Sequence, residues 1–183
     1  DLDLLKRTIT KSKPDIIFHL AAQPLVRESY KKPILTWSTN VMGTLNLLES
    51  LRELNKKCAV VLITTDKVYK NNGWIYGYRE NDELGGNDPY SASKAATEIM
   101  INSWRKSFCN SNTNQRNLKI ASARAGNVIG GGDWAKDRII PDIIRSIKNK
   151  EDLQIRNRYS TRPWQHVIEP LYGYLLLSMY LYE

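Results

Sequence analysis

The chain has 183 residues, 42% of them hydrophobic and 25% charged, with a formal net charge of +8. This length supports a hydrophobic core of useful size. The positive residues are scattered rather than grouped on a basic helix, so we expect a solvated surface and no nucleic-acid partner. Cys58 and Cys109 lack metal-site spacing and fit reduced thiols of a cytoplasmic protein better than a disulfide framework. No metal site is expected. The apolar stretch at 171–183 is too short to cross a membrane.

Three apolar runs that end in small or polar residues predict strands of a parallel sheet, at residues 15–20, 59–65 and 118–124. Segments with helical patterns precede and separate them, at residues 1–13, 33–55 and 89–108. This alternation predicts a βαβαβ arrangement with right-handed crossovers.

The remaining segments are predicted to be mostly loops. Residues 23–33 form a loop, and residues 66–88 form a long active-site loop, with a small hairpin around 74–79. Residues 110–117 form a polar surface turn. Beyond the third strand we expect a glycine-rich loop, a helix, a short strand and a last helix, at residues 126–137, 138–149, 153–155 and from 168 onward.

Tyr90 and Lys94 are the most informative pair in the chain. A tyrosine four residues before a lysine on a helix places both side chains on one face. A neighbouring ammonium favours the phenolate, so such a tyrosine can take a proton from an alcohol near neutral pH. Taken alone, this spacing most often marks a solvated helix face. The strand context favours dehydrogenase-type chemistry.

Thr65, Asp66 and Lys67 directly follow the apolar run of the second strand. In open α/β sheets the carboxyl ends of the strands carry ligands and catalysis. A hydroxyl, a carboxyl and an amine at this place are therefore candidate catalytic groups. The competing interpretation is a solvated turn in which Thr65 bonds to its own backbone.

Together these patterns resemble the extended short-chain dehydrogenase/reductase superfamily, within it the nucleotide-sugar epimerases and dehydratases. The resemblance covers nearly the whole chain and is strongest to the CDP-glucose 4,6-dehydratase family. The runs at 124–134 and 162–170 carry that assignment. Asp66-Lys67 supports it, because dTDP-glucose dehydratases usually have Asp-Glu at this place.

The resemblance implies an α/β fold with a Rossmann-like, doubly wound parallel sheet that is incomplete, and part of a smaller α/β substrate-binding domain. We expect a partial NAD-binding domain at 1–130 and a partial nucleotide-sugar-binding region at 131–183. The glycine-rich turn that opens a Rossmann half has no counterpart in the sequence. The expectation is an internal fragment that lacks the first βαβ unit.

The implied reaction is dehydration of CDP-glucose to a 4-keto-6-deoxy sugar, with transient oxidation at C4, loss of water across C5 and C6, and hydride return to C6. Tyr90 would deprotonate the 4-hydroxyl, with Lys94 and Thr65 beside it. Asp66 would be the acid for the leaving 6-hydroxyl if burial raised its pKa. Lys67 would act either as the base at C5 or as a cation that stabilises the enolate.

NAD is the implied cofactor, although the residue that separates NAD from NADP cannot be identified in this sequence. The expected cofactor-binding residues line the strand ends and the catalytic helix: Ala21, Ala22, Gln23, Asn40, Thr64, Tyr90 and Lys94. For the alanines, core packing is nearly as good an interpretation, and Asn40 is expected to position backbone rather than touch substrate. His19, inside a strand, is expected to be a hydrogen-bonded core histidine.

The substrate diphosphate and nucleotide are expected to contact Asn127, Arg138, Arg162 and His166. A helix-cap role for Arg138 and a packing role for His166 remain open. The family also implies a cytoplasmic homodimer through helices 38–55 and 89–108, supplying dideoxyhexose for surface polysaccharide. Two other functions stay open. One is a nucleotide-sugar 4-epimerase, and the other is a catalytically silent nucleotide-sugar-binding fragment.

Overall fold

The computed structural model describes residues 1–109 and 117–183. The described part forms two compact units, one made of residues 1–125 with 173–183 and one made of residues 126–172. Apart from residue 117, the predicted polar turn at 110–117 lies outside the described residues.

The first unit is built on three parallel strands in the order β1 (Ile16–His19), β2 (Cys58–Ile63) and β3 (Leu118–Ala123). β2 is the central strand, and its residue Val60 pairs with Ile17 on one side and Ile120 on the other. Residues 58–62 are at most 1% exposed, as expected for an apolar strand covered on both faces. The three predicted strands are confirmed, each a little shorter than expected.

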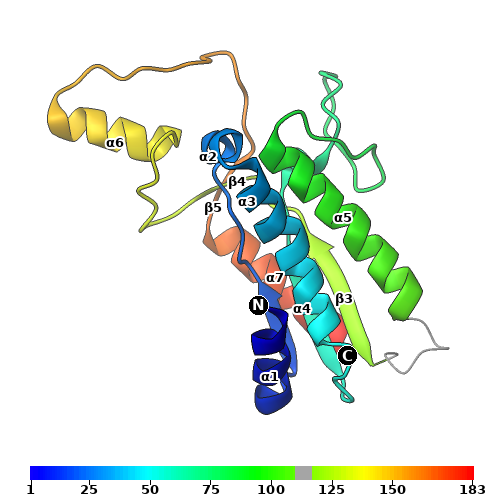
Figure 1. Cartoon of the computed structure of the whole chain (residues 1–183). Helices are drawn as coiled ribbons and strands as arrows, with labels where there is room; N and C mark the ends of the chain where they lie inside the picture. The colour runs from blue at the N-terminus through cyan, green and yellow to red at the C-terminus, as the bar shows by residue number, and fades with distance from the viewer. Residues whose placement is uncertain (110–116) are drawn as a thin grey trace. The chain divides into compact units, whose positions relative to one another are not determined.

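Helices of the first unit alternate with these strands: α1 (Leu2–Ser12), α2 (Val26–Lys31), α3 (Pro33–Trp37), α4 (Gly43–Ser50) and α5 (Pro89–Phe108). α3 and α4 are joined by a π-helical segment, Ser38–Met42, into one continuous helix that runs beside α5 (Figure 1). The predicted helix at 33–55 is thus present but ends earlier. Its π-helical segment is the kind of irregularity that often marks a functional site.

The core lies between β2, β3 and the helix pair of α4 and α5. Its most deeply buried side chains are Leu48, Leu51, Leu62 and Ile101, each at most 2% exposed. Burying a side chain of this kind contributes roughly 1.5–3 kcal/mol. The apolar stripe on α4 and the apolar run of β2 therefore hold α5, the helix of Tyr90 and Lys94, against the sheet.

The start of α5 is set by its sequence. Asp88 is the N-cap and accepts hydrogen bonds from the backbone N–H groups of Tyr90 and Ser91, both at 3.0 Å. The Ser91 side chain completes a capping box, and Pro89 occupies the first turn. Gly86 lies so close to this turn that a Cβ there would be 2.3 Å from the backbone nitrogen of Ala92. These residues together favour the start of the helix at Pro89.

Three expectations for the loops and short elements were wrong. The stretch 23–33 contains the helix α2. Glu28 and Lys32, one turn apart, form an ion pair at 2.9 Å that supports this helix. The expected hairpin around 74–79 closes instead at an antiparallel bridge between Tyr69 and Leu84, with stacked aromatic rings in the loop. Residues 153–155 form no strand, because neither of the two described sheets has a strand that pairs with them.

The second unit contains β4 (Asn127–Ile129), α6 (Ile139–Asn149), β5 (Trp164–His166) and the beginning of α7 (Ile168–Tyr182). β4 pairs with β5 in parallel. Gly126 permits this approach, since a Cβ there would lie 2.8 Å from the carbonyl oxygen of Pro163. The predicted helices at 138–149 and from 168 are confirmed.

The compact units differ from the domain limits expected from the sequence. The boundary between the two units falls after residue 125 rather than after residue 130, and residues 173–183 group with the first unit. In that unit Tyr182 donates its hydroxyl to Asp15 at 3.1 Å, and the Lys57 amine lies 4.8 Å from the Tyr182 ring centroid. These contacts explain why the end of α7 groups with residues 1–125. The functional division at residue 130 stays a prediction.

Replacing Gly86 by alanine is expected to destabilise the fold by about 1–3 kcal/mol, because the new methyl group overlaps the backbone of α5. Gly85→Ala is a matched control, since its Cβ meets only the Lys70 side chain at 3.4 Å. Denaturant unfolding of both variants measures the difference. Equal stability of the two would contradict the close packing at Gly86.

Candidate active site

Tyr90 and Lys94 occupy the first two turns of α5 and are both buried, with 8% and 6% of their surface exposed. The Lys94 amine donates a hydrogen bond to the backbone carbonyl of Ile63, at 3.1 Å. Ile63 is the last residue of β2, so the lysine reaches the carboxyl end of the central strand. This is the edge at which parallel sheets of α/β proteins bind ligands.

Burial changes the acidity of Lys94. Loss of water around the ammonium lowers the pKa of Lys94 to about 8, and the negative charge of Glu98 opposes this shift. A lysine of this kind is still largely protonated at neutral pH and loses its charge in mildly alkaline solution. It can therefore supply a positive charge beside Tyr90 in a place with little water.

Thr65, Asp66 and Lys67 form a compact polar turn directly after β2. Thr65 caps a short 3₁₀ helix (Asp66–Val68) and donates its hydroxyl to Asp66 Oδ1 at 3.0 Å. The Lys67 amine lies 3.2 Å from the same oxygen. The side chains of Asp66 and Lys67 are about one-third exposed (31% and 34%), so both can meet a bound molecule.

Glu98 is a buried charged residue beside Lys94 that the sequence reasoning missed. It lies one turn after Lys94 on α5, is 5% exposed, and accepts hydrogen bonds from Thr64, from Ser122 at 2.9 Å and from Arg124 at 2.9 Å. Burial alone would raise the pKa of Glu98, but these donors, Arg124 first, hold it below its ordinary value. The signal available in the sequence was a glutamate four residues after the lysine, on the same helix face.

Asn40 and Gln23, two expected cofactor residues, are engaged in a buried hydrogen-bond network. Asn40 accepts from the Gln23 backbone at 2.8 Å and donates to Ser93 Oγ at 2.9 Å. Ser93 in turn donates to the carbonyl of Tyr90 at 2.7 Å. The Gln23 amide donates to Thr36 at 2.8 Å. Asn40 thus links the loop after β1 to the catalytic helix, the positioning role expected for it.

Thr64, the remaining polar residue expected at the cofactor, has its hydroxyl bonded to Glu98 and is 6% exposed. Its side chain holds the end of β2 to α5. A cofactor contact through this hydroxyl stays a prediction. Of the predicted catalytic groups, Lys94 and the turn Thr65–Lys67 lie at the end of β2, and Tyr90 lies one turn before Lys94 on α5.

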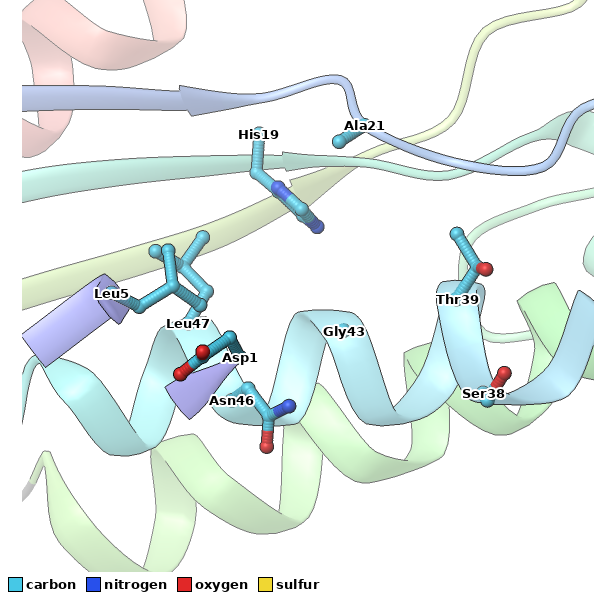
Figure 2. Close-up of a pocket in the computed structure, with 9 residues that line it drawn as sticks. All are labelled: Asp1, Leu5, His19, Ala21, Ser38, Thr39, Gly43, Asn46 and Leu47. Atoms are coloured by element: carbon cyan, nitrogen blue, oxygen red, sulfur yellow. The ribbon is translucent and has the colours of Figure 1, made fainter. Parts of the chain in front are cut away.

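A pocket of about 420 Å³ lies between β1, the start of α1 and the helix formed by the π segment and α4 (Figure 2). His19 and Ala21 line one side of it, and Ser38, Thr39 and Asn46 line the other. The described lining residues do not include Tyr90 or Lys94. Ala21 is the expected cofactor residue that this pocket includes.

His19 behaves as a hydrogen-bonded histidine rather than a catalyst. Its Nε2 lies 3.2 Å from Thr44 Oγ1, and that hydroxyl donates to the carbonyl of Asn40 at 2.7 Å. Burial, followed by the positive charge of Lys94, lowers the pKa of His19. The neutral ring then donates to Thr44 and fastens β1 to α4.

The four expected substrate residues belong to the second unit. Arg138 forms an ion pair with Asp133 at 2.8 Å, and Arg162 donates to the carbonyl of Thr161 at 2.7 Å. His166 accepts the backbone N–H of Ile168 at 3.3 Å through Nδ1. Asn127 opens β4, where its backbone N–H donates to Pro163 at 3.1 Å. Their contacts with a substrate stay predictions.

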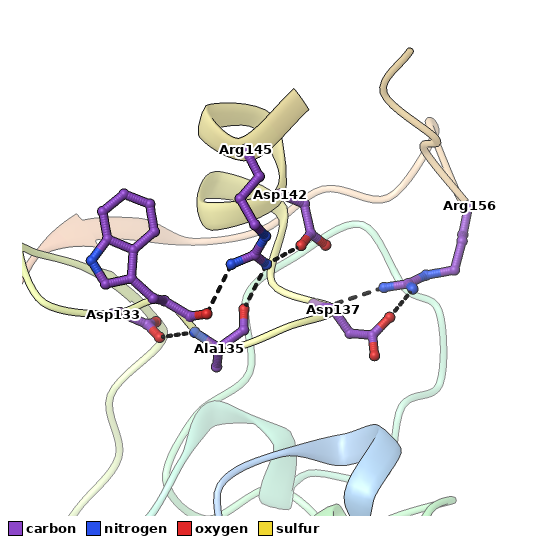
Figure 3. A network of polar contacts seen from close by, with 7 residues as sticks. Asp133, Ala135, Asp137, Asp142, Arg145 and Arg156 are labelled. Carbon is purple, nitrogen blue, oxygen red and sulfur yellow. Dashed lines mark hydrogen bonds and ion pairs between the residues drawn. The ribbon is translucent and has the colours of Figure 1, made fainter. Parts of the chain in front are cut away.

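Two further arginines of this unit, Arg145 and Arg156, brace the loop between β4 and α6 (Figure 3). Arg145 pairs with Asp142 and donates to the carbonyl of Ala135 at 3.2 Å. Arg156 pairs with Asp137. Since both guanidinium groups are neutralised by aspartates, Arg162 is the more accessible candidate for a phosphate.

Within the ranges 1–109 and 117–183, no cluster of three or more His, Cys, Asp or Glu side chains has the arrangement of a metal site. None of the helices described in these ranges combines the length and apolar character needed to cross a membrane.

Comparison with known proteins agrees with the predicted resemblance. Residues 1–177 match the family model for GDP-mannose 4,6 dehydratase. The chain is 56% identical over all 183 residues to a CDP-glucose 4,6-dehydratase of Salmonella typhimurium, which confirms the expected likeness. It spans 51% of that protein, about half its length.

Solved structures give the same fold. A UDP-glucose 4-epimerase of Thermotoga maritima matches with a TM-score of 0.83 at 23% identity, over 96% of this chain and 55% of the epimerase. A dTDP-glucose 4,6-dehydratase of Streptomyces venezuelae, solved with NAD bound, matches with a TM-score of 0.82 at 24% identity, over 97% of this chain and 51% of that one. The expected α/β fold with an incomplete Rossmann-like sheet is confirmed, and by its sequence match the chain belongs to the GDP-mannose 4,6 dehydratase family.

Proposed function

We propose that the protein to which this chain belongs is a hydro-lyase that converts CDP-glucose to CDP-4-keto-6-deoxyglucose with NAD. The observation that carries the proposal is the meeting of two groups of residues at the end of β2. Lys94 reaches it from α5, with Tyr90 one turn before it on the same helix, and Thr65, Asp66 and Lys67 follow it in the chain. The identity to the Salmonella CDP-glucose dehydratase supports the choice of sugar nucleotide.

The first half of the reaction is assigned to Tyr90, Lys94 and Thr65. Tyr90 takes the proton of the sugar 4-hydroxyl, and the Lys94 ammonium favours the phenolate that does so. Thr65 is assigned a hydrogen bond to the same alcohol from the strand end. Lys94 has a fixed direction because the Ile63 carbonyl holds its amine at 3.1 Å.

NAD fits the residues at this edge of the sheet. Lys94 supplies a buried amine for a ribose hydroxyl, and the small side chain of Ala21 opens a pocket whose other wall carries the polar groups of Ser38, Thr39 and Asn46. When bound, the nicotinamide supplies the acceptor for the C4 hydride and its later donor to C6. Ala22, Gln23, Asn40 and Thr64 complete the proposed surroundings of the cofactor.

Elimination is assigned to Asp66 and Lys67. A ketone at C4 acidifies the C5 hydrogen, because the resulting carbanion delocalises into the carbonyl. Asp66, once protonated, gives its proton to the departing 6-hydroxyl. Lys67 either takes the C5 proton or stabilises the enolate as a cation. Their contact at 3.2 Å supports the proposal that they act on the same substrate.

On the substrate side, the diphosphate is assigned to Arg162 and Asn127, with Arg138 and His166 near the nucleotide. Arg162 is exposed and its planar guanidinium can bind two phosphate oxygens. The cytosine base is inferred from the identity to the Salmonella enzyme alone. The further expectations of a cytoplasmic location and of dideoxyhexose supply for O-antigen rest on the same resemblance.

A nucleotide-sugar 4-epimerase is the alternative within the same family fold. It shares the Tyr90 and Lys94 chemistry but does not require the Asp66–Lys67 pair. A nucleotide-sugar-binding protein without catalysis is the alternative outside enzymes. The product of the reaction distinguishes the three, because only dehydration yields a 4-keto-6-deoxy sugar.

We further propose a homodimer through the helix of residues 38–55 and α5. Several side chains on α3, the π segment and α5 are apolar and exposed, namely Ile34 (84%), Leu35 (50%), Met42 (49%) and Ile99 (59%). Two copies of this helix pair would cover them in a four-helix bundle.

The first prediction concerns the reaction itself. Incubated with CDP-glucose and NAD, the full-length protein is expected to form a sugar that absorbs in the near ultraviolet in alkali. Tyr90→Phe should lower kcat by about 10²–10⁴-fold, because the alcohol loses its base. Tyr76→Phe is the control, since Tyr76 is 64% exposed and stacks on Trp74.

Parallel reactions with UDP-, GDP- and dTDP-glucose test the base. Keto-sugar from one of these instead of CDP-glucose would leave the mechanism intact and overturn the substrate. No keto-sugar from any donor would exclude dehydration and favour the epimerase or the silent protein.

The second prediction concerns pH. Since the pKa of Lys94 is lowered to about 8 by burial, the ammonium that assists Tyr90 is present below this pH and lost above it. We therefore expect kcat to fall as pH rises through about 8. The exposed Lys11 serves as a control, and Lys11→Met should leave the profile unchanged. A kcat that stays constant between pH 7 and pH 10 would contradict this role for Lys94.

The third prediction concerns assembly. Light scattering of the full-length protein is expected to give twice the monomer mass. Ile99→Asp should lower the measured mass toward that of one monomer, because a carboxylate would be buried in the bundle. Ile147→Asp on α6, at an apolar side chain that is 73% exposed, is the matched control. An unchanged mass for Ile99→Asp would exclude this interface.

A further inference from the structure

Glu98 is a buried charge that the proposed chemistry does not use. Only 5% of its surface is exposed, and it lies on the catalytic helix one turn after Lys94. A carboxylate this deeply buried is unfavourable unless hydrogen-bond donors replace its water. Its retention beside the catalytic pair therefore requires a reason.

The donors to Glu98 come from two different strands. Thr64 Oγ1, at the end of β2, bonds to one carboxylate oxygen. Ser122 on β3 and Arg124 just beyond β3 bond to the other, each at 2.9 Å. One carboxylate thus joins α5 to the carboxyl ends of two adjacent strands.

Arg124 extends this connection to the long loop after β2. Its second terminal nitrogen donates to the Tyr69 hydroxyl at 3.0 Å and to the Glu80 carbonyl at 3.1 Å. The guanidinium also lies over the Tyr69 ring, 5.0 Å from its centroid, and Tyr69 stacks on Tyr78. The loop that begins with Asp66 and Lys67 is therefore anchored on Arg124.

We propose that Glu98 and Arg124 are positioning residues that hold the Tyr90–Lys94 helix and the Thr65–Lys67 turn in one arrangement. The proposal rests on the proposed dehydratase function. Thr64 is the direct link, because it is bonded to Glu98 and precedes Thr65. Arg124 is the second link, because it fixes the loop three residues after Asp66.

Charge gives Glu98 a second effect on Lys94. The titratable groups on the elements packed around Lys94 are Tyr90 and Glu98 on α5, His19 on β1, and Asp66 and Lys67 after β2. Burial lowers the pKa of Lys94 to about 8, and the charge of Glu98 keeps it from falling further. Removal of that charge should therefore move the Lys94 titration to lower pH.

The test compares Glu98→Gln with the control variant Glu49→Gln. Glu49 lies on α4 and forms an exposed ion pair with Arg52. In the full-length protein, acetic anhydride labels Lys94 as a function of pH, and mass spectrometry gives the midpoint. We expect Glu98→Gln to lower this midpoint and the alkaline limb of kcat together, and to reduce kcat more than tenfold with little change in KM. Glu49→Gln should change neither.

Two conservative variants separate positioning from charge. Glu98→Asp keeps the charge but shortens the reach, so it should preserve the Lys94 midpoint and still lower kcat. Arg124→Lys keeps the positive charge but loses the hydrogen bonds to Tyr69 and Glu80. It too should preserve the Lys94 midpoint and lower kcat. If Glu98→Gln does not fold, these two variants are compared with the unmodified protein instead.

The outcomes are distinguishable from a failure of the proposed function. The Lys94 midpoint can be measured whether or not the wild-type protein forms a keto-sugar. A lower thermal stability of Glu98→Gln, with an unchanged Lys94 midpoint and unchanged kcat, would assign Glu98 a structural role only and overturn the inference.

Discussion

Burial of opposite charges at the carboxyl end of the central strand is the constraint on which the site depends. Lys94 and Glu98 lie one turn apart on α5, inside a protein environment that disfavours both charges. Each is kept by specific partners, the Ile63 carbonyl for the amine and Thr64, Ser122 and Arg124 for the carboxylate. The position of α5 on the sheet is therefore specified by polar contacts as well as by its apolar face.

This arrangement costs stability in return for reactivity. The pKa of Lys94 is about 8 in the folded chain against an ordinary value of 10.5, so the folded state is disfavoured by about 3 kcal/mol below pH 8. That penalty declines as the pH rises toward 10.5, because the unfolded chain then also loses the proton. The apolar contacts of Leu48, Leu62 and Ile101 across α4, β2 and α5 offset it. A lysine with a lowered pKa beside Tyr90 is thus tolerated because the well-packed core around it supplies the compensating stability.

The elements with strong local patterns were predictable from the sequence, and those set by distant contacts were not. The apolar run of β2 and the Pro89 start of α5 define their elements within a few residues. β4 and β5 are three residues each and more than thirty residues apart, so no local sequence pattern predicts that they pair. The same holds for the site. Tyr90 and Lys94 stand out by spacing, whereas the role of Glu98 depends on Arg124, which reaches it from another strand.

The loop between β2 and α5 shows why these contacts matter for the choice of reaction. It begins at Asp66 and Lys67 and ends at the Asp88 cap before Tyr90, so its two ends carry the groups assigned to elimination and to oxidation. Dehydration requires both sets to act on the consecutive carbons C4, C5 and C6 of one sugar, whereas epimerisation requires only the second. A loop held at Tyr69 by Arg124 and at Gly86 by close packing on α5 keeps the two sets in register. These contacts at both ends of the loop therefore support the proposed dehydration over epimerisation.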